Sequence, residues 1–194
     1  LEDLDATVAT AFAQALEVIA RAGAHVSELP LTELTELTQF NSKGGFSAAE
    51  LYARHVRLIA EHAAQYDPRV LTRILRGREQ SAAEYLELQR LRADFIERVS
   101  ARVQPYDALC LPTTPICAPR MSELVEDAAY VRANALALRN PAVVNFFDGC
   151  SISLPCHEPG TAPVGLMLAG LRGADQKLFA LAAGIEAVLA RRHR

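Results

Sequence analysis

The chain has 194 residues, of which 51% are hydrophobic, and a formal net charge of −3 at pH 7. This length is enough to bury a sizeable core, and the composition is that of an ordinary globular domain. The weak negative charge gives no electrostatic basis for binding nucleic acid, and no apolar run approaches the roughly 18 residues of a membrane span. The four cysteines lack CxxC spacing and lie in or beside apolar runs, which favours reduced thiols in a cytoplasmic protein.

The opening segment, residues 4–19, has an apolar residue every three or four positions, which predicts an amphipathic helix. Asp3 stands where a helix N-cap is expected, and Gly23 stands where a helix ends. Residues 24–29 are predicted to form a strand, so the chain opens with a helix that leads into a strand, as in α/β proteins. Because the chain starts at Leu1 rather than at methionine, we expect a piece of a longer polypeptide.

Residues 32–102 are predicted to be almost wholly helical. Two identical runs, Ser47-Ala-Ala-Glu50 and Ser81-Ala-Ala-Glu84, have the pattern of a capping box, in which serine and glutamate each bond the other's backbone N–H. Asp67 followed by proline predicts the start of a further short helix between them.

Three short apolar segments in the second half, each bounded by proline or glycine, are predicted strands: residues 107–111, 151–155 and 163–169. One helix is predicted between the first two strands, ending at the break before Pro141, and another begins at Asp175. The short link between the last two strands predicts an antiparallel hairpin with a wide loop. With residues 24–29, these strands make a mixed sheet of at least four strands covered by helices, in a single α/β unit spanning residues 1–194.

Three stretches of the second half resemble the amidase signature family: Tyr106 to Pro115, Asn145 to Pro155 and Ala162 to Gly170. The resemblance extends to the opening helix and to the helical region around Asp67-Pro68, Arg73-Ile74 and Gly77. It covers essentially the whole chain but only the C-terminal part of the family's sequence. It implies the C-terminal part of the amidase signature fold, in enzymes that hydrolyse amides or transfer the released ammonia.

The resemblance also implies which catalytic residues to look for: a nucleophilic serine, a second serine held by a cis peptide, and a lysine. In the family these lie N-terminal to everything present here. This chain has no two adjacent serines, and its only lysines, Lys43 and Lys177, have no Ser-Gly-Gly-Ser-Ser context. A serine nucleophile needs a base within hydrogen-bond reach and oxyanion donors. We therefore predict no catalytic residue in this chain, and we expect it to complete the sheet and wall the substrate pocket of a complete amidase.

Six residues are candidates for lining that pocket: Thr113, Thr114, Pro115, Asn145, Asp148 and Gly149. The first three follow the end of a predicted strand, where α/β proteins tend to place ligands, although prolines there can also simply end the strand. The other three have the composition of a turn, and forming a turn is the simpler explanation for them.

Other kinds of site have weaker support. Cys150 and His157 flank a strand and would lie about 20 Å apart if it is extended, which argues against a cysteine hydrolase. The histidines have no metal-ligand spacing, so we predict neither a metal nor a cofactor. The arginines of the helical region alternate with acidic residues, which predicts a solvated, paired surface.

One position bears on the substrate. Amidotransferase A subunits that act on misacylated tRNA typically carry an acid seven positions before the asparagine of the turn, where this chain has Leu138. The resemblance therefore favours a stand-alone amidase whose complete form takes a small or aryl/alkyl amide. The competing hypothesis is a non-catalytic relic or interaction module of amidase ancestry. In both cases an open sheet edge predicts self-association or pairing with the missing N-terminal part.

Overall fold

The computed structural model describes residues 2–191, and the chain divides into two compact units. Unit 1 combines the two ends of the chain, up to Pro30 and from Ser100 onwards, and unit 2 is Leu31–Val99. The sequence predicted one unit with a helical stretch over residues 32–102. Unit 2 covers nearly the same residues as that predicted helical stretch.

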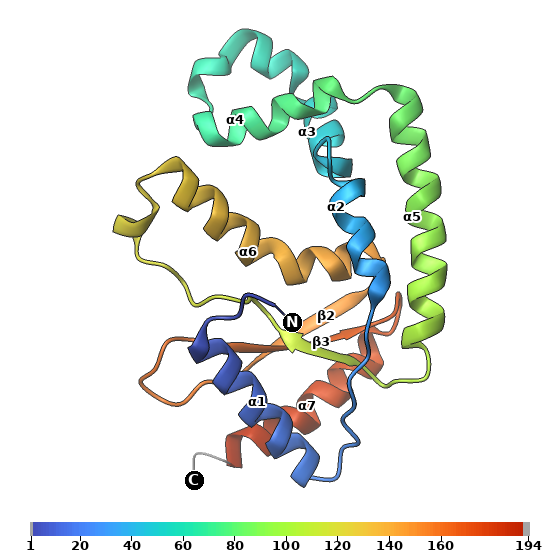
Figure 1. Ribbon diagram of the computed structural model, residues 1–194, viewed down its shortest axis with the longest axis vertical. Helices are drawn as coiled ribbons and strands as arrows, with labels where there is room; N and C mark the ends of the chain where they lie inside the picture. Colours follow the sequence, from blue (N-terminus) through green and yellow to red (C-terminus); the bar gives the residue numbers. More distant parts are fainter. Residues whose placement is uncertain (1, 192–194) are drawn as a thin grey trace. The chain divides into compact units, whose positions relative to one another are not determined.

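Unit 1 is built on a three-stranded sheet with the strand order β1-β3-β2 (Figure 1). The strands are β1 Leu109–Pro112, β2 Cys150–Pro155 and β3 Gly165–Gly170, close to three of the predicted strands. Both outer strands pair antiparallel with β3. The predicted hairpin between the last two strands is therefore confirmed, and the prediction of a mixed sheet is wrong.

The strand predicted over residues 24–29 is absent, because the segment has no regular secondary structure. Most of it is exposed, including Val26 at 43%. A strand needs a neighbour to satisfy its backbone N–H and C=O groups, and no strand among the described residues pairs with this segment. The apolar pattern of this segment shows that it could form a strand, but it does not show whether another strand lies beside it.

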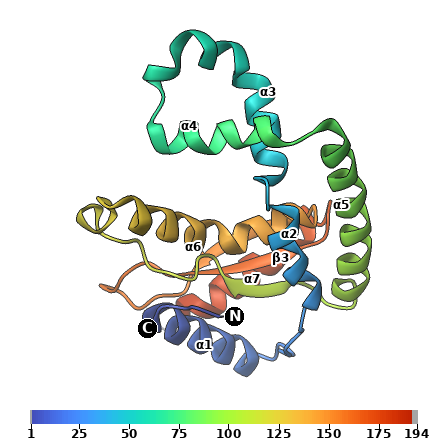
Figure 2. The ribbon, with the colours of Figure 1, turned by 45° about the horizontal axis from the view of Figure 1, so that its top comes forward.

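Strand β3 is buried on both of its faces. Successive side chains of a strand point to opposite faces, so Leu166 and Leu168 face one way while Met167 and Ala169 face the other. Helices α1 (Ala6–Arg21) and α7 (Asp175–Arg191) cover the Leu166 face, and Figure 2 shows α6 (Asp127–Phe146) on the opposite side. The core on the α1 and α7 side includes Val8, Phe12, Ala15, Ile19, Leu154, Leu178, Ala182, Ile185 and Leu189.

Helix α6 continues through Pro141, where the sequence predicted its end. A proline inside a helix removes one backbone hydrogen bond, which weakens the helix at that point. Beyond it, Val144 and Phe146 are buried, and their burial offsets the lost bond. Asn140, the residue before the proline, is also buried, at 4% exposure.

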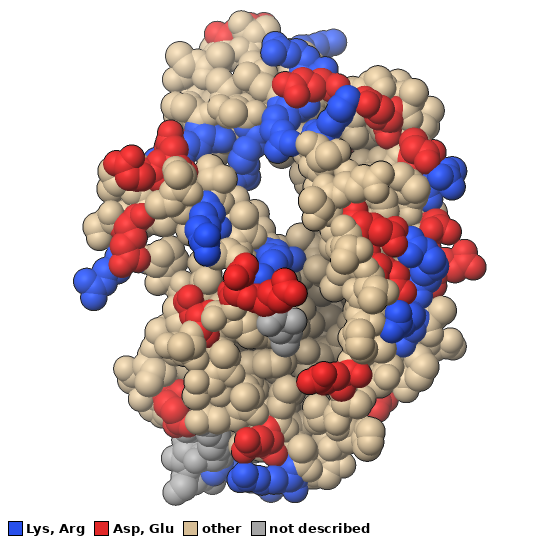
Figure 3. Space-filling model, viewed as in Figure 1, with Lys and Arg blue, Asp and Glu red and all other residues tan. Residues whose placement is uncertain are grey.

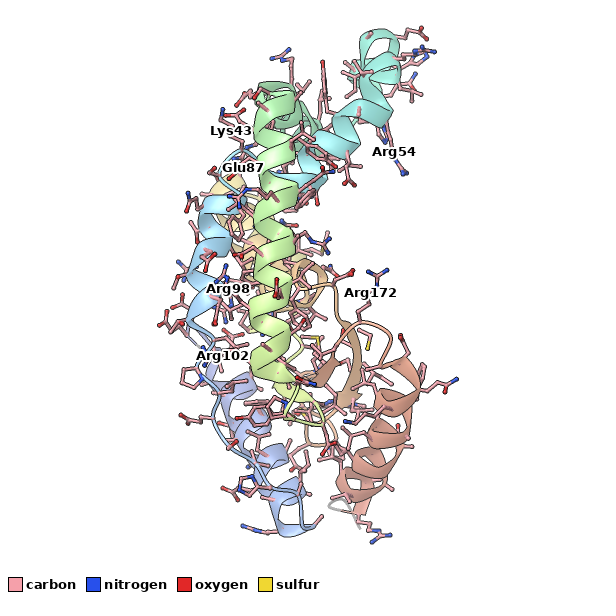
Figure 4. The ribbon with its side chains drawn as sticks, turned by 90° about the vertical axis from the view of Figure 1, so that its right-hand side faces the viewer. Lys43, Arg54, Glu87, Arg98, Arg102 and Arg172 are labelled. Atoms are coloured by element: carbon pink, nitrogen blue, oxygen red, sulfur yellow. The ribbon has the colours of Figure 1, made fainter. Side chains whose placement is uncertain are left out.

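Unit 2 consists of helices and ends inside α5, at Val99. The helices are η1 Thr32–Thr35, α2 Glu36–Phe40, α3 Gly45–His62, η2 Ala63–Gln65, α4 Pro68–Leu75, η3 Arg76–Glu79 and α5 Ala82–Val103. The rings of Phe40 and Phe95 meet edge to face at 6.0 Å. Arg98, on α5 in Figure 4, donates to both carboxylate oxygens of Glu36, at 2.7 and 2.8 Å. This two-point ion pair and the ring contact join α2 to α5.

The two Ser-Ala-Ala-Glu runs differ in what they do. Ser81 caps α5: its hydroxyl accepts the Glu84 N–H at 3.2 Å, and the Glu84 carboxylate accepts the Ser81 N–H at 2.8 Å. Ser47 lies inside the first turn of α3, whose N-cap is Gly44 with a left-handed φ of 88°. The first predicted capping box is therefore wrong, because α3 begins before its serine.

This difference predicts unequal effects of the same substitution. Ser81→Ala should lower the free energy of unfolding by about 1 kcal/mol, since it removes a helix cap. Ser47→Ala, at an exposed position inside a helix, should change it by less than about 0.5 kcal/mol. Urea denaturation followed by circular dichroism measures both, and equal losses would contradict the assigned caps.

The capping box also predicts a pH dependence. The hydrogen bond from Lys43, at 2.6 Å, and those from Ser81 lower the pKa of Glu84 from 4.5 to about 2. A carboxyl whose pKa falls on folding stabilises the fold above its unfolded pKa, and this contribution is lost as pH falls through the folded value. Glu84→Gln should therefore be less stable than the parent chain at pH 7, with the difference shrinking between about pH 4.5 and 2. A constant difference across that range in urea titrations would contradict the assignment.

Candidate functional site

The loop after β1, which holds Thr113, Thr114 and Pro115, is fastened at both ends. Thr113 donates its backbone N–H to the Gly165 carbonyl at 2.8 Å, which extends the pairing with β3. The Thr114 hydroxyl donates to the Ile116 carbonyl at 2.9 Å inside the loop. Pro115 is fully buried. The loop is therefore a rigid attachment to the sheet.

Asp5 closes this loop from the far end of the chain. Its N–H donates to the Pro115 carbonyl at 2.9 Å, and its carboxylate accepts the Cys117 N–H at 2.8 Å. Asp5, rather than the predicted Asp3, occupies the N-cap position of α1. Its side chain accepts a hydrogen bond from the loop and makes no capping bond to the helix.

Asn140 fixes the start of the same loop from α6. Its Nδ2 donates to the Pro112 carbonyl at 2.7 Å, at the last residue of β1. The sequence pointed only to a helix end here, and an asparagine before a proline is not a specific sign of such a contact. The structure adds Asn140 to the residues that position Thr113.

The other three predicted residues form the turn between α6 and β2. Asp148 has a left-handed φ of 61°, and its carboxylate lies 3.2 Å from Nη1 of Arg172, which is labelled in Figure 4. A Cβ on Gly149 would collide with the Phe147 ring and the Gly170 carbonyl oxygen. This close approach requires glycine, and Asn145 begins the turn from the last helical residues.

The structure does not bring the two predicted groups together. Thr113 is bonded to Gly165 at the start of β3, whereas Gly149 packs on Gly170 at its end. Five steps of extended strand separate Gly165 from Gly170, about 17 Å. The six predicted residues therefore lie at opposite ends of the sheet.

Sequence reasoning missed Ser153 and Gly165, which belong with Thr113. The hydroxyl oxygens of Thr113 and Ser153 lie 2.5 Å apart, although β3 separates their strands. They meet above Gly165, where a Cβ would collide with both oxygens. Ser151 and Ser153 alternate with apolar residues, a pattern that indicates one polar face of β2. The pattern does not show which residues of other strands lie near Ser153.

Cys150 and His157, the two residues that a cysteine hydrolase would need here, lie at opposite ends of β2. Cys150 starts β2 and His157 follows its other end. The Cys150 thiol donates to the Leu171 carbonyl at 3.4 Å, and burial raises the pKa of the Cys110 thiol. In the part of the chain that the structure describes, no group of three histidine, cysteine, aspartate or glutamate side chains could hold a metal ion.

Both lysines form ion pairs at the surface. Lys43 lies 2.6 Å from Glu84, and Lys177 lies 2.9 Å from Asp107. Figure 3 shows basic and acidic side chains intermixed over the face it presents, and Arg90 pairs with Glu87 at 2.7 Å. Within residues 2–191, no helix combines the length and the apolar character that crossing a bilayer requires.

An apolar hollow of about 240 Å³ lies between α1 and α7, away from all six predicted residues. It is lined by Ile19, Ala22, Ala24, Ala180, Leu181, Gly184, Ile185 and Val188. None of these side chains carries a polar or ionisable group, so the hollow has no group that could do chemistry.

Comparison with known proteins decides the family. A family model described as Amidase matches residues 1–179. The chain belongs to the amidase family. It is 33% identical to 2-amino-5-chloromuconic acid deaminase of Comamonas testosteroni over 197 residues, which cover 99% of this chain and 42% of that protein. This amidase-family chain thus spans about two fifths of that relative's length.

The relatives include more than one kind of amidase. The glutamyl-tRNA(Gln) amidotransferase of Thermotoga maritima has a subunit that is 24% identical over 206 residues, covering 95% of this chain and 42% of that one. Among solved structures, Kluyveromyces lactis allophanate hydrolase matches with a TM-score of 0.84 at 22% identity, covering 95% of this chain and 30% of that one. The structural match shows that the chain has the fold of a portion of these enzymes.

The Asn140 contact predicts a specific loss of stability. Asn140→Ala leaves the Pro112 carbonyl without its donor and should lower the free energy of unfolding by about 1–3 kcal/mol. Asn134→Ala, on the same helix, is the matched control and should change it by less than about 0.5 kcal/mol. Thermal or urea unfolding measures both, and equal losses would show that the Asn140 contact contributes nothing.

Proposed function

We propose that this chain is the C-terminal portion of an amidase, a carbon–nitrogen hydrolase acting on a small carboxamide. In that role it completes the sheet, walls the substrate pocket and is catalytically incomplete by itself. One combination of observations carries the proposal. The amidase family model matches residues 1–179, yet the sequence holds no adjacent serines and only two lysines.

The ion pairs of the lysines support this assignment of the catalytic groups to residues outside the chain. A general base must be neutral and lie within hydrogen-bond reach of the nucleophile. Lys43 and Lys177 each contact a carboxylate, at 2.6 and 2.9 Å, rather than a serine hydroxyl. In the complete enzyme, a serine outside this chain would take the acyl group from the carboxamide, and water would then release the acid.

The finer assignment is to a stand-alone amidase rather than a tRNA-dependent amidotransferase. Leu138, at the position where the latter typically has an acid, is half exposed on α6 and offers no charge to a substrate. The first relative is also more similar than the tRNA-linked one, at 33% against 24% identity. Its name describes release of ammonia from a small amino-substituted acid, so we propose small, ammonia-releasing substrates for the complete form of this chain.

The proposed partner is the N-terminal part of an amidase, bound along an outer edge of the sheet. In an antiparallel pair, alternate residues bond to the partner strand while those between point their N–H groups outward. The Cys156 N–H bonds to Val164, so on β2 the outward N–H groups are those of Ser151 and Ser153. Neither β1 nor β2 carries a charged side chain to block a further strand. Without that partner, self-association is expected.

Ammonia release tests the proposal directly. The chain alone should release no ammonia from a panel of small carboxamides and amino-substituted acids. The chain extended by the polypeptide encoded upstream of Leu1 should release it, and replacing the serine nucleophile in that extension should abolish the activity. Matched variants Cys150→Ala and His157→Ala should leave the extended enzyme active.

Two results would contradict the proposal. Turnover by the chain alone that is lost in Cys150→Ala or His157→Ala would place the chemistry in this chain. An upstream sequence without the serine-rich segment and lysine would identify a non-catalytic relic or interaction module.

A further inference from the structure

A pair of hydroxyl groups crosses the sheet at the carboxyl end of β1. Thr113 follows β1 and Ser153 lies on β2, and β3 runs between them. Neighbouring strands lie about 4.8 Å apart, so residues two strands apart normally do not touch. Thr113 lies beside Gly165, and Ser153, which pairs with Met167, reaches it diagonally across Gly165, which has no side chain to separate them.

The hydroxyl pair, Thr113 and Ser153, is not required to hold the strands together. Both β1 and β2 are already bonded to β3 through the backbone, and Thr113 has its own N–H bond to Gly165. Ser153 is exposed and Thr113 is half-buried, so the pair can be reached from solvent. The rest of this sheet face on β1 and β3 is apolar, through Leu109, Leu111, Met167 and Ala169.

The hydrogen-bond donors and acceptors of the two hydroxyls determine which kind of group the pair can bind. Each hydroxyl has one donor and two acceptor lone pairs, and the bond between them uses one of each. One O–H donor and three lone pairs remain for a ligand. A carboxamide can fill both roles, since its carbonyl accepts and its NH₂ donates, whereas a carboxylate only accepts.

The charges around the hydroxyl pair and the rigidity of its loop also favour a carboxamide as the ligand. In the described part of the chain, no lysine or arginine is hydrogen-bonded to either hydroxyl, and carboxylate sites usually hold such a cation. The loop that carries Thr113 is fixed by Asn140 at Pro112 and by Asp5 at Pro115. A ligand would therefore bind hydroxyls that are already in place, which lowers the ordering cost of binding.

We propose that Thr113 and Ser153, meeting above Gly165, recognise a carboxamide group of the substrate. This inference rests on the proposed amidase function. It assigns substrate binding to the end of the sheet where Thr113 follows β1. The pair binds the amide group and takes no part in breaking the bond.

Titration of the chain with propionamide, followed by nuclear magnetic resonance of the Thr113 and Gly165 amides, tests the proposal without any turnover. Propionamide should shift both signals saturably, and propionate should bind at least about threefold more weakly. Ser153→Ala and Thr113→Val each remove one hydroxyl and should raise the dissociation constant about three- to tenfold. Thr113→Ser keeps the hydroxyl and should bind as the parent chain does.

Ser151→Ala is the matched control, since Ser151 is exposed on the same face of β2, two residues further from Gly165 than Ser153 is. It should leave the dissociation constant unchanged. The proposal is overturned by no saturable shift with propionamide, by equal binding of propionate, or by equal losses in Ser151→Ala and Ser153→Ala. None of these results touches the amidase proposal, which depends on ammonia release by the extended enzyme.

Discussion

The pairing of β3 on both of its edges is the interaction on which the rest of unit 1 depends. Its backbone is bonded to β1 on one side and to β2 on the other. Buried backbone groups are costly when unpaired, so a strand this deeply buried needs both neighbours. Its two faces then supply the surface on which α1 and α7 pack, and the opposite surface near α6. In the part of the chain that the structure describes, β1 and β2 are the outer strands of this sheet.

The predicted site residues fall into two groups because the loop after β1 and the turn before β2 lie at opposite ends of β3. At one end, Gly165 lets the hydroxyls of Thr113 and Ser153 meet. At the other end, Gly149 lets the turn after α6 approach the Gly170 carbonyl closely. The first end presents polar groups on a fixed loop, and the second is a tightly packed turn. The proposed substrate contact therefore belongs to the first end.

The sequence predicts those features that local patterns determine. The three strands, the hairpin and the caps at Asp67 and Ser81 all depend on neighbouring residues, and the structure has each of them. Ser47 has the same letters as Ser81 but lies inside a helix, because α3 starts earlier at a glycine. A capping pattern thus predicts a helix start only where the helix has not already begun at an earlier residue.

Features set by distant contacts could not be predicted. Residues 24–29 have a strand's composition, but no strand within residues 2–191 pairs with them. Helix α6 passes Pro141 because later residues are buried. The meeting of Thr113 with Ser153, and the contact of Asn140 with Pro112, join positions 40 and 28 residues apart. Such contacts follow from the strand register and the placement of α6, which no single segment encodes.

Hydrogen exchange at the sheet edges tests most directly the proposal that this chain completes a larger sheet. In the chain alone, the amides of Ile152 and Leu154 should exchange slowly, because they bond to β3, while those of Ser151 and Ser153 exchange fast. In the chain extended by its upstream polypeptide, the outward amides of one edge, either Ser151 and Ser153 on β2 or Cys110 on β1, should become protected. Outward amides that stay unprotected on both edges would contradict the account.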